Sequence, residues 1–103
     1  MPRESMRPLV LVVEDNPANL LLARAVLERD GYRILAARST EEARRYLDIV
    51  RPSLILMNIQ LPGEDGLSLS QQLKADPATA SIRLVALTAH AHEIQGLTAV
   101  LRL

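Results

Sequence analysis

The sequence predicts a single α/β domain in which the strands of a parallel sheet alternate with helices. Three short apolar runs, at residues 9–13, 54–57 and 82–87, are separated by segments with helical spacing of apolar residues. Strands and helices that alternate in this way form right-handed β-α-β units. A chain of 103 residues has room for one such core and for no second domain.

The first strand and the first helix carry clear signals at their ends. Residues 9–13 are a continuous, β-branched-rich apolar run, which is typical of a strand covered on both faces. Asn16 and Pro17 supply a helix cap and a first-turn proline, and Asp30-Gly31 ends the helix that they begin.

The middle of the chain repeats the pattern. Residues 32–36 form a short predicted strand, and Ser39 opens a capping box for a helix that reaches about Ile49. Residues 54–57 form the third strand, and a proline- and glycine-containing loop follows at residues 60–66.

The last third contains one more helix and one more strand before the pattern changes. The helix covers residues 67–75 and the fourth strand covers residues 82–87. Residues 92–103 form a divergent tail in which Ile94, Leu97, Val100 and Leu101 have the spacing of an amphipathic helix. We therefore expect a domain over residues 7–103 with about four strands, and no fifth strand is recognisable.

Composition excludes several classes of function. Twelve acidic residues balance twelve basic ones, and the only aromatic residues are two tyrosines, so neither a nucleic-acid footprint nor a membrane-surface patch is expected. The chain has no cysteine, no signal-peptide core and no spanning segment. These features favour a soluble protein in the cytoplasm.

Polar side chains follow two of the predicted strands. Glu14 and Asp15 come directly after the first strand, and Asn58 comes after the third. Because the carboxyl ends of parallel strands meet at one edge, these groups should form an oxygen-lined pocket suited to Mg²⁺ and a phosphoryl group. Position 58 is where a nucleophilic carboxylate would lie, and a carboxamide cannot attack phosphorus to form an acyl phosphate.

These motifs resemble the receiver domain of two-component response regulators and hybrid histidine kinases. The resemblance covers roughly residues 8–91. It rests on Glu14-Asp15-Asn16 with Asn19, on the segment from Asn58 to Gly66, and on Leu87-Thr88-Ala89. It implies a flavodoxin-like, doubly wound parallel sheet of order 2-1-3-4-5, of which the first four strands are recognisable here.

The resemblance also implies roles for individual residues. Glu14 and Asp15 resemble the acidic pair that holds Mg²⁺, and the backbone carbonyl of Gln60 resembles a third ligand. Thr88 resembles the switch hydroxyl that bonds a phosphoryl oxygen. Asn58 occupies the phosphoacceptor position, where the family has Asp.

A second departure from the family pattern concerns the positive charge that neutralises the phosphoacceptor and its phosphate. The family places a Lys-Pro pair after its fifth strand, and this pair is missing. The only lysine, Lys74, lies on the helix before the fourth strand, and Arg102 lies in a tail without matching context. We therefore expect no phosphorylation at Asn58 and a weak or absent Mg²⁺ site in which Asn58 still offers an oxygen.

Simpler interpretations stand beside these. Glu14 and Asp15 also suit the positive end of the helix that follows them, and Thr88 suits an ordinary strand end. His90 and His92 have no third metal-binding partner in the sequence and are more typical of solvated loop residues.

Three functional hypotheses follow. The first is a non-enzymatic signalling module that binds a histidine kinase or a second receiver. The second is a Mg²⁺-dependent phosphoryl-accepting switch that is blocked by the Asp-to-Asn change at position 58. The third is a truncated receiver without selected activity that self-associates. The apolar tail and an open fourth strand would favour a homodimer.

Overall fold

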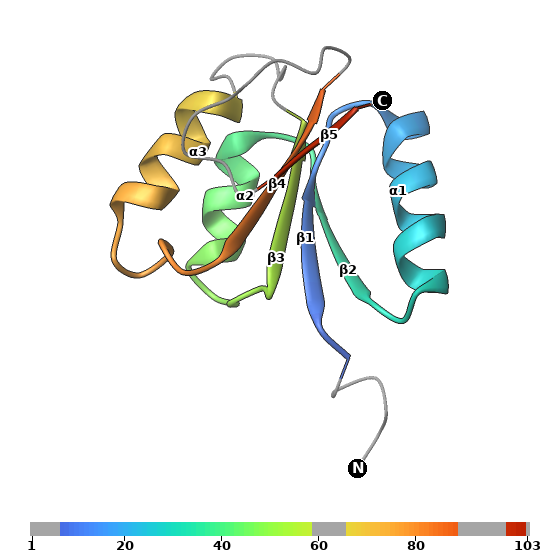
Figure 1. The fold of residues 1–103 in the computed structure, drawn as a ribbon, viewed down its shortest axis with the longest axis horizontal. Coiled ribbons are helices and arrows are strands. Elements are labelled where there is room, and N and C mark those ends of the chain that lie inside the picture. Colours follow the sequence, from blue (N-terminus) through green and yellow to red (C-terminus); the bar gives the residue numbers. More distant parts are fainter. Residues whose placement is uncertain (1–6, 59–65, 89–98, 103) are drawn as a thin grey trace.

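The protein is described by a computed structural model that covers residues 7–58, 66–88 and 99–102 (Figure 1). The elements along the chain are β1 (Leu9–Val13), α1 (Pro17–Arg29), β2 (Arg33–Ala37), α2 (Thr40–Leu47), β3 (Leu54–Asn58), α3 (Gly66–Ala75), β4 (Arg83–Thr88) and β5 (Ala99–Arg102). The predicted elements up to β4 are all present, and the ends of β2, β3 and β4 differ from the predictions by one residue.

The strands form one parallel sheet of order β2-β1-β3-β4-β5. Helix α1 covers one face of this sheet, and α2 and α3 cover the other (Figure 1). The doubly wound α/β fold and the strand order 2-1-3-4 are therefore confirmed. Within the described ranges, no helix combines the length and hydropathy that a bilayer crossing requires.

The prediction of a helical tail and only four strands is wrong for residues 99–102. These residues form β5, which pairs in parallel with β4 from Val85↔Ala99 to Thr88↔Arg102. A four-residue apolar segment fits helix and strand equally well by periodicity. The unpaired backbone groups along the edge of β4 decide the outcome, because they offer hydrogen bonds that only a strand can take. Residues 92–98 of the predicted helix lie outside the described residues.

The core has two halves, one on each side of the sheet. Leu11 and Val13 of β1 belong to the cluster that includes Ala43 of α2 and Leu69 of α3. Val10 and Val12 belong to the opposite cluster, which packs against Leu20, Ala23 and Leu27 of α1. This alternation follows from the two-residue period of a strand. Successive residues at the end of β1 therefore lie toward different helical layers.

Local signals fix the ends of α1 and α2. The Asn16 side chain accepts hydrogen bonds from the backbone N of Ala18 at 2.9 Å and of Asn19 at 3.1 Å. The Ser39 hydroxyl accepts one from the backbone N of Glu42 at 3.1 Å. Each bond satisfies an amide that the first helical turn leaves unpaired. The predicted caps of both helices are thus confirmed.

The buried side chain of Leu11 tests this core directly. Replacing Leu11 by Ala should lower the free energy of unfolding by about 2 to 5 kcal/mol, because Leu11 is fully buried in β1, which has a neighbouring strand on each side. The matched change Ile49→Ala removes an aliphatic side chain that is 77% exposed and should cost less than about 0.5 kcal/mol. Urea denaturation measures both values, and equal losses would contradict the assigned core.

Candidate functional site

Glu14 and Asn58 meet at the carboxyl edge of the sheet. The register Val13↔Met57 brings the next residue of each strand side by side. The backbone N of Glu14 still donates to the carbonyl of Ala37 at 2.9 Å, so Glu14 continues the path of β1. The amide Nδ2 of Asn58 donates to Oε2 of Glu14 at 2.8 Å. The structure thus brings together two of the predicted pocket residues.

Side-chain alternation explains why these two residues share a face. Val12 and Leu56 lie in the core cluster beneath α1. Two residues further along their strands, Glu14 and Asn58 return to that same face. The site therefore lies above the α1 half of the core, where the turn into α1 begins.

Glu14 is a buried acid with one satisfied oxygen. Its side chain is 1% exposed. Oε2 takes the Asn58 bond and a longer one of 3.4 Å from the backbone N of Asn16. Oε1 is buried and has no hydrogen-bond partner among the described residues. A buried acceptor without a donor costs about 1 to 3 kcal/mol, so a cation at Oε1 would be favourable.

The amide of Asn58 changes the electrostatics of this pair. A carboxylate at position 58 would place two like charges at the distance of a hydrogen bond, and a cation would be needed to hold them together. The carboxamide instead supplies an N–H donor to Glu14. The N–H group of Asn58 therefore stabilises the Glu14 carboxylate, as a bound cation would stabilise a pocket of carboxylates.

Asp15 lies in the turn between β1 and the cap of α1 and is partly exposed. Among the described residues, no three His, Cys, Asp or Glu side chains gather as a metal site. Glu14 and Asp15 adjoin in the sequence at this edge, so their carboxylates are the groups that would hold a cation there. Glu14 and Asp15 are hard oxygen donors and fit Mg²⁺. The orphaned Oε1 of Glu14 is consistent with such an ion.

The helix-dipole interpretation of the acids explains less of this geometry. The first turn of α1 contains no acidic residue. The contact of Glu14 with the backbone near α1 is 3.4 Å long, whereas its bond to Asn58 is 2.8 Å long. The main partner of Glu14 is thus a neighbouring strand and not the helix end.

The other predicted site residues are only partly described. Thr88 ends β4, one register position beyond the pair Asn58↔Leu87, so its backbone lies at the same edge. Gln60, His90 and His92 lie outside the described residues.

Two basic residues can now be placed. Lys74 Nζ donates to the carbonyl of Ile82 at 3.4 Å. Ile82 directly precedes β4, so this contact lies at the opposite edge of the sheet from Asn58. The expectation that Lys74 cannot serve the pocket is therefore confirmed. The expectation that Arg102 lacks context is wrong, because Arg102 ends β5 in register with Thr88. The signal that was missed is a short apolar run ending in a polar residue, as in β1 and β3.

Comparison with known proteins agrees with this architecture. The sequence model described as "Response regulator receiver domain" matches residues 10–101, which extends past residue 91 where the sequence motifs end. The chain is 40% identical over 93 residues to the sensor protein GacS of Pseudomonas syringae, covering 87% of this chain and 10% of GacS. It is 43% identical over 89 residues to the polar-differentiation response regulator DivK of Brucella ovis, covering 84% of this chain and 70% of DivK.

A solved structure shows the same fold with a metal. The receiver domain of the sensor histidine kinase PA1611 from Pseudomonas aeruginosa is 30% identical, with a TM-score of 0.83 over 93% of this chain and 84% of that one. That structure has a magnesium ion coordinated in its active-site cleft. The family match and the sheet topology together lead to one conclusion: this chain belongs to the response regulator receiver domain family of two-component signalling.

Proposed function

We propose that this receiver domain cannot be phosphorylated at residue 58 and that it acts by binding another signalling protein. The bond from Asn58 Nδ2 to Glu14 Oε2 at 2.8 Å carries the proposal. An acyl phosphate forms when a carboxylate oxygen attacks phosphorus and displaces the leaving group of the donor. Asn58 offers an uncharged amide in place of that oxygen. Its hydrogen bond to Glu14 joins the two sides of the pocket without any phosphoryl transfer.

The phosphodonor test addresses the first half of the proposal. Incubation with acetyl phosphate and Mg²⁺ should leave the intact mass of the protein unchanged, because residue 58 has no nucleophilic oxygen. The control is Asn58→Asp under the same conditions. A base-labile mass gain of one phosphoryl group in the native chain would overturn the proposal.

The second candidate is a phosphoryl-accepting switch that the Asp-to-Asn change blocks. Arg102 favours it, because the end of β5 brings a basic residue into register with Thr88. In that case the pocket would lack only the nucleophile. A phosphoryl gain in Asn58→Asp supports this candidate, and no gain in that variant favours the permanent docking module.

We also propose that the pocket holds Mg²⁺ weakly and that Glu14 and Asp15 would be its ligands. The ion would supply positive charge beside an incoming anionic group. The amide of Asn58 weakens this binding, because it replaces a negative charge with a donor that competes for Glu14 Oε2. One charge at about 4 Å is worth roughly 1 kcal/mol in water and about 4 kcal/mol at an effective dielectric constant of 20.

A magnesium titration tests this balance. Asn58→Asp should tighten Mg²⁺ binding about fivefold or more, which corresponds to ~1 kcal/mol. Glu14→Gln should abolish the binding. Asn19→Asp makes the same chemical change on α1 and should alter the affinity little. Calorimetry measures the Mg²⁺ affinity of the native chain and of the three variants, and equal affinities of the native chain and Asn58→Asp would refute the proposed role of the amide.

An apolar surface on α1 supports the proposed docking role. Leu21 and Leu22 are 68% and 64% exposed, and Val26 is also exposed. These side chains lie on the outer side of α1, since Leu20, Ala23 and Leu27 pack toward the sheet. Exposed aliphatic side chains grouped on one helix favour a protein partner. We propose a cytoplasmic histidine kinase, whose helices would pack against this surface.

A two-hybrid screen against the histidine kinases of the same genome tests this surface. At least one kinase should give a signal, and the double change Leu21→Ser and Leu22→Ser should remove it. The control Ile49→Ser alters an exposed aliphatic residue after α2, on the other layer. A signal that survives the double change, or one that the control also removes, would contradict the assignment.

Self-association remains a third proposal, and the same screen tests it with the chain paired against itself. Since β5 covers β4, the exposed edge of the described sheet on that side is β5. Backbone pairing between two β5 edges would give a homodimer. The absence of any self-signal would count against it.

A further inference from the structure

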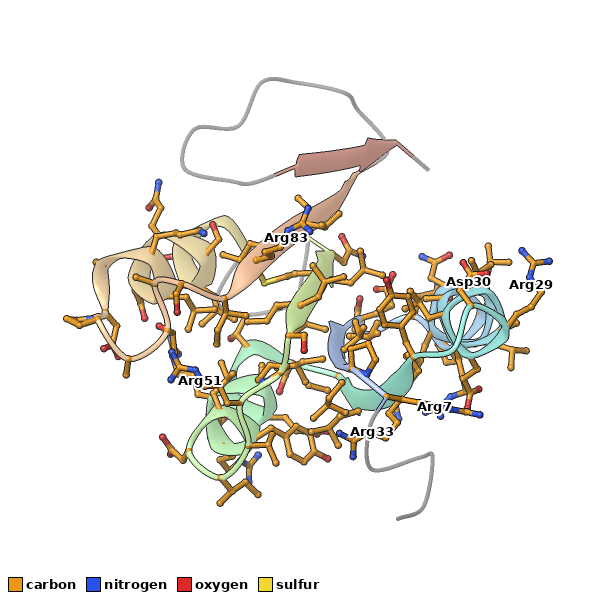
Figure 2. All side chains as sticks on the ribbon, turned by 60° about the horizontal axis from the view of Figure 1, so that its bottom comes forward. Arg7, Arg29, Asp30, Arg33, Arg51 and Arg83 are labelled. Carbon is orange, nitrogen blue, oxygen red and sulfur yellow. The ribbon has the colours of Figure 1, made fainter. Side chains whose placement is uncertain are left out.

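A cavity lined by arginines lies at the amino edge of the sheet, at the opposite end from Glu14 and Asn58. It has a volume of about 540 Å³. It is lined by Arg7, Arg33 and Arg51 together with Pro8, Leu9, Val50 and Ser53. We call this feature the arginine cavity. Figure 2 views the molecule from this end and shows Arg7, Arg33 and Arg51 on it.

Backbone hydrogen bonds build the walls of the arginine cavity. The backbone N of Arg33 donates to the carbonyl of Pro8 at 2.9 Å, and that of Ser53 donates to the carbonyl of Leu9 at 2.8 Å. Arg33 Nε also donates to the carbonyl of Arg7 at 3.0 Å. The starts of β1, β2 and β3 are thus joined at this edge. The backbone of this site is therefore in place before a ligand binds, whereas its three arginine side chains are exposed and would be ordered by the ligand.

The three guanidinium groups keep most of their hydrogen-bonding capacity within the described part of the chain. Arg51 donates to the Ser81 hydroxyl at 3.2 Å, and Arg33 uses one N–H for the carbonyl of Arg7, so most of their N–H donors have no acceptor among the described residues. Among the residues that the structure describes, no carboxylate forms an ion pair with any of the three. Arg7, Arg33 and Arg51 are all exposed, and they bring three positive charges to one end of the sheet although the whole chain has no net charge. An anion bound beside them would gain charge-assisted hydrogen bonds.

The lining selects the chemical class of that anion. Guanidinium groups match the oxygen geometry of phosphate and bind it with paired hydrogen bonds. The aliphatic surfaces of Pro8 and Val50 suit an uncharged organic group beside the phosphate. The volume lies within the range of roughly 300 to 1,000 Å³ that is typical of small-molecule sites. A cavity of this size has room for more than a free phosphate ion.

We propose that the arginine cavity binds a small organic diphosphate of the nucleoside diphosphate type. The charge lies at one end of the sheet and does not form a long stripe. No aromatic side chain lines the cavity for base stacking. Both features favour a small ligand over a nucleic acid. This site is separate from the carboxyl-edge pocket and does not depend on the function proposed for that pocket.

The test uses ADP as the probe in magnesium-free buffer. Calorimetry should show saturable binding of one ADP per chain, with competition by inorganic pyrophosphate and no binding of adenosine. Arg33→Gln and Arg51→Gln should each weaken ADP binding about tenfold or more, which fits the loss of one charged hydrogen-bonding group. Amide NMR shifts should appear at Arg33 and Ser53.

The matched control is Arg29→Gln. Arg29 ends α1, is exposed and does not line the cavity, yet its loss removes the same charge (Figure 2). It should bind ADP as the native chain does. Any one of four results would overturn the proposal: no saturable ADP binding, equal weakening in Arg29→Gln, NMR shifts at Glu14 instead of Ser53, or a random oligonucleotide that displaces ADP from the cavity. Urea midpoints close to the native value establish that the variants are folded.

Discussion

The buried carboxylate of Glu14 is the constraint around which the carboxyl edge is organised. A charge at 1% exposure is tolerated only when polar groups surround it. The Asn58 amide supplies one such group at 2.8 Å. The register of β1 against β3 makes this contact possible, because it sets residue 14 beside residue 58. The pocket thus has the frame of a receiver, and a hydrogen bond between an amide and a carboxylate joins its two strands.

The two edges of the sheet carry different functional groups. The carboxyl edge gathers Glu14 and Asp15, and the amino edge gathers the guanidinium groups that line the arginine cavity. One edge therefore suits a cation and the other suits an anion, and the apolar surface of α1 lies between them on the flank.

The sequence predicts the features that depend on neighbours in the chain. The Asn16 cap, the Ser39 capping box and the strand that leads to Glu14 were all predictable, because each signal is local. The tail was not. Residues 99–102 have no strong preference of their own, and only the edge of β4, distant in sequence, makes them a strand. The arginine cavity was hidden for the same reason, since the residues that line it come to one edge only when β1, β2 and β3 pair.

The role of the Asn58 amide is tested most directly by the free energy of unfolding of Asn58→Asp in the absence of divalent metal. The hydrogen bond from the Asn58 amide to Glu14 holds the pocket together, and the variant replaces it with two carboxylates that face each other. Without metal, the variant should therefore lose roughly 1 to 4 kcal/mol of unfolding free energy. Added Mg²⁺ should restore most of this loss. A variant that is as stable as the native chain in metal-free urea denaturation would contradict the account.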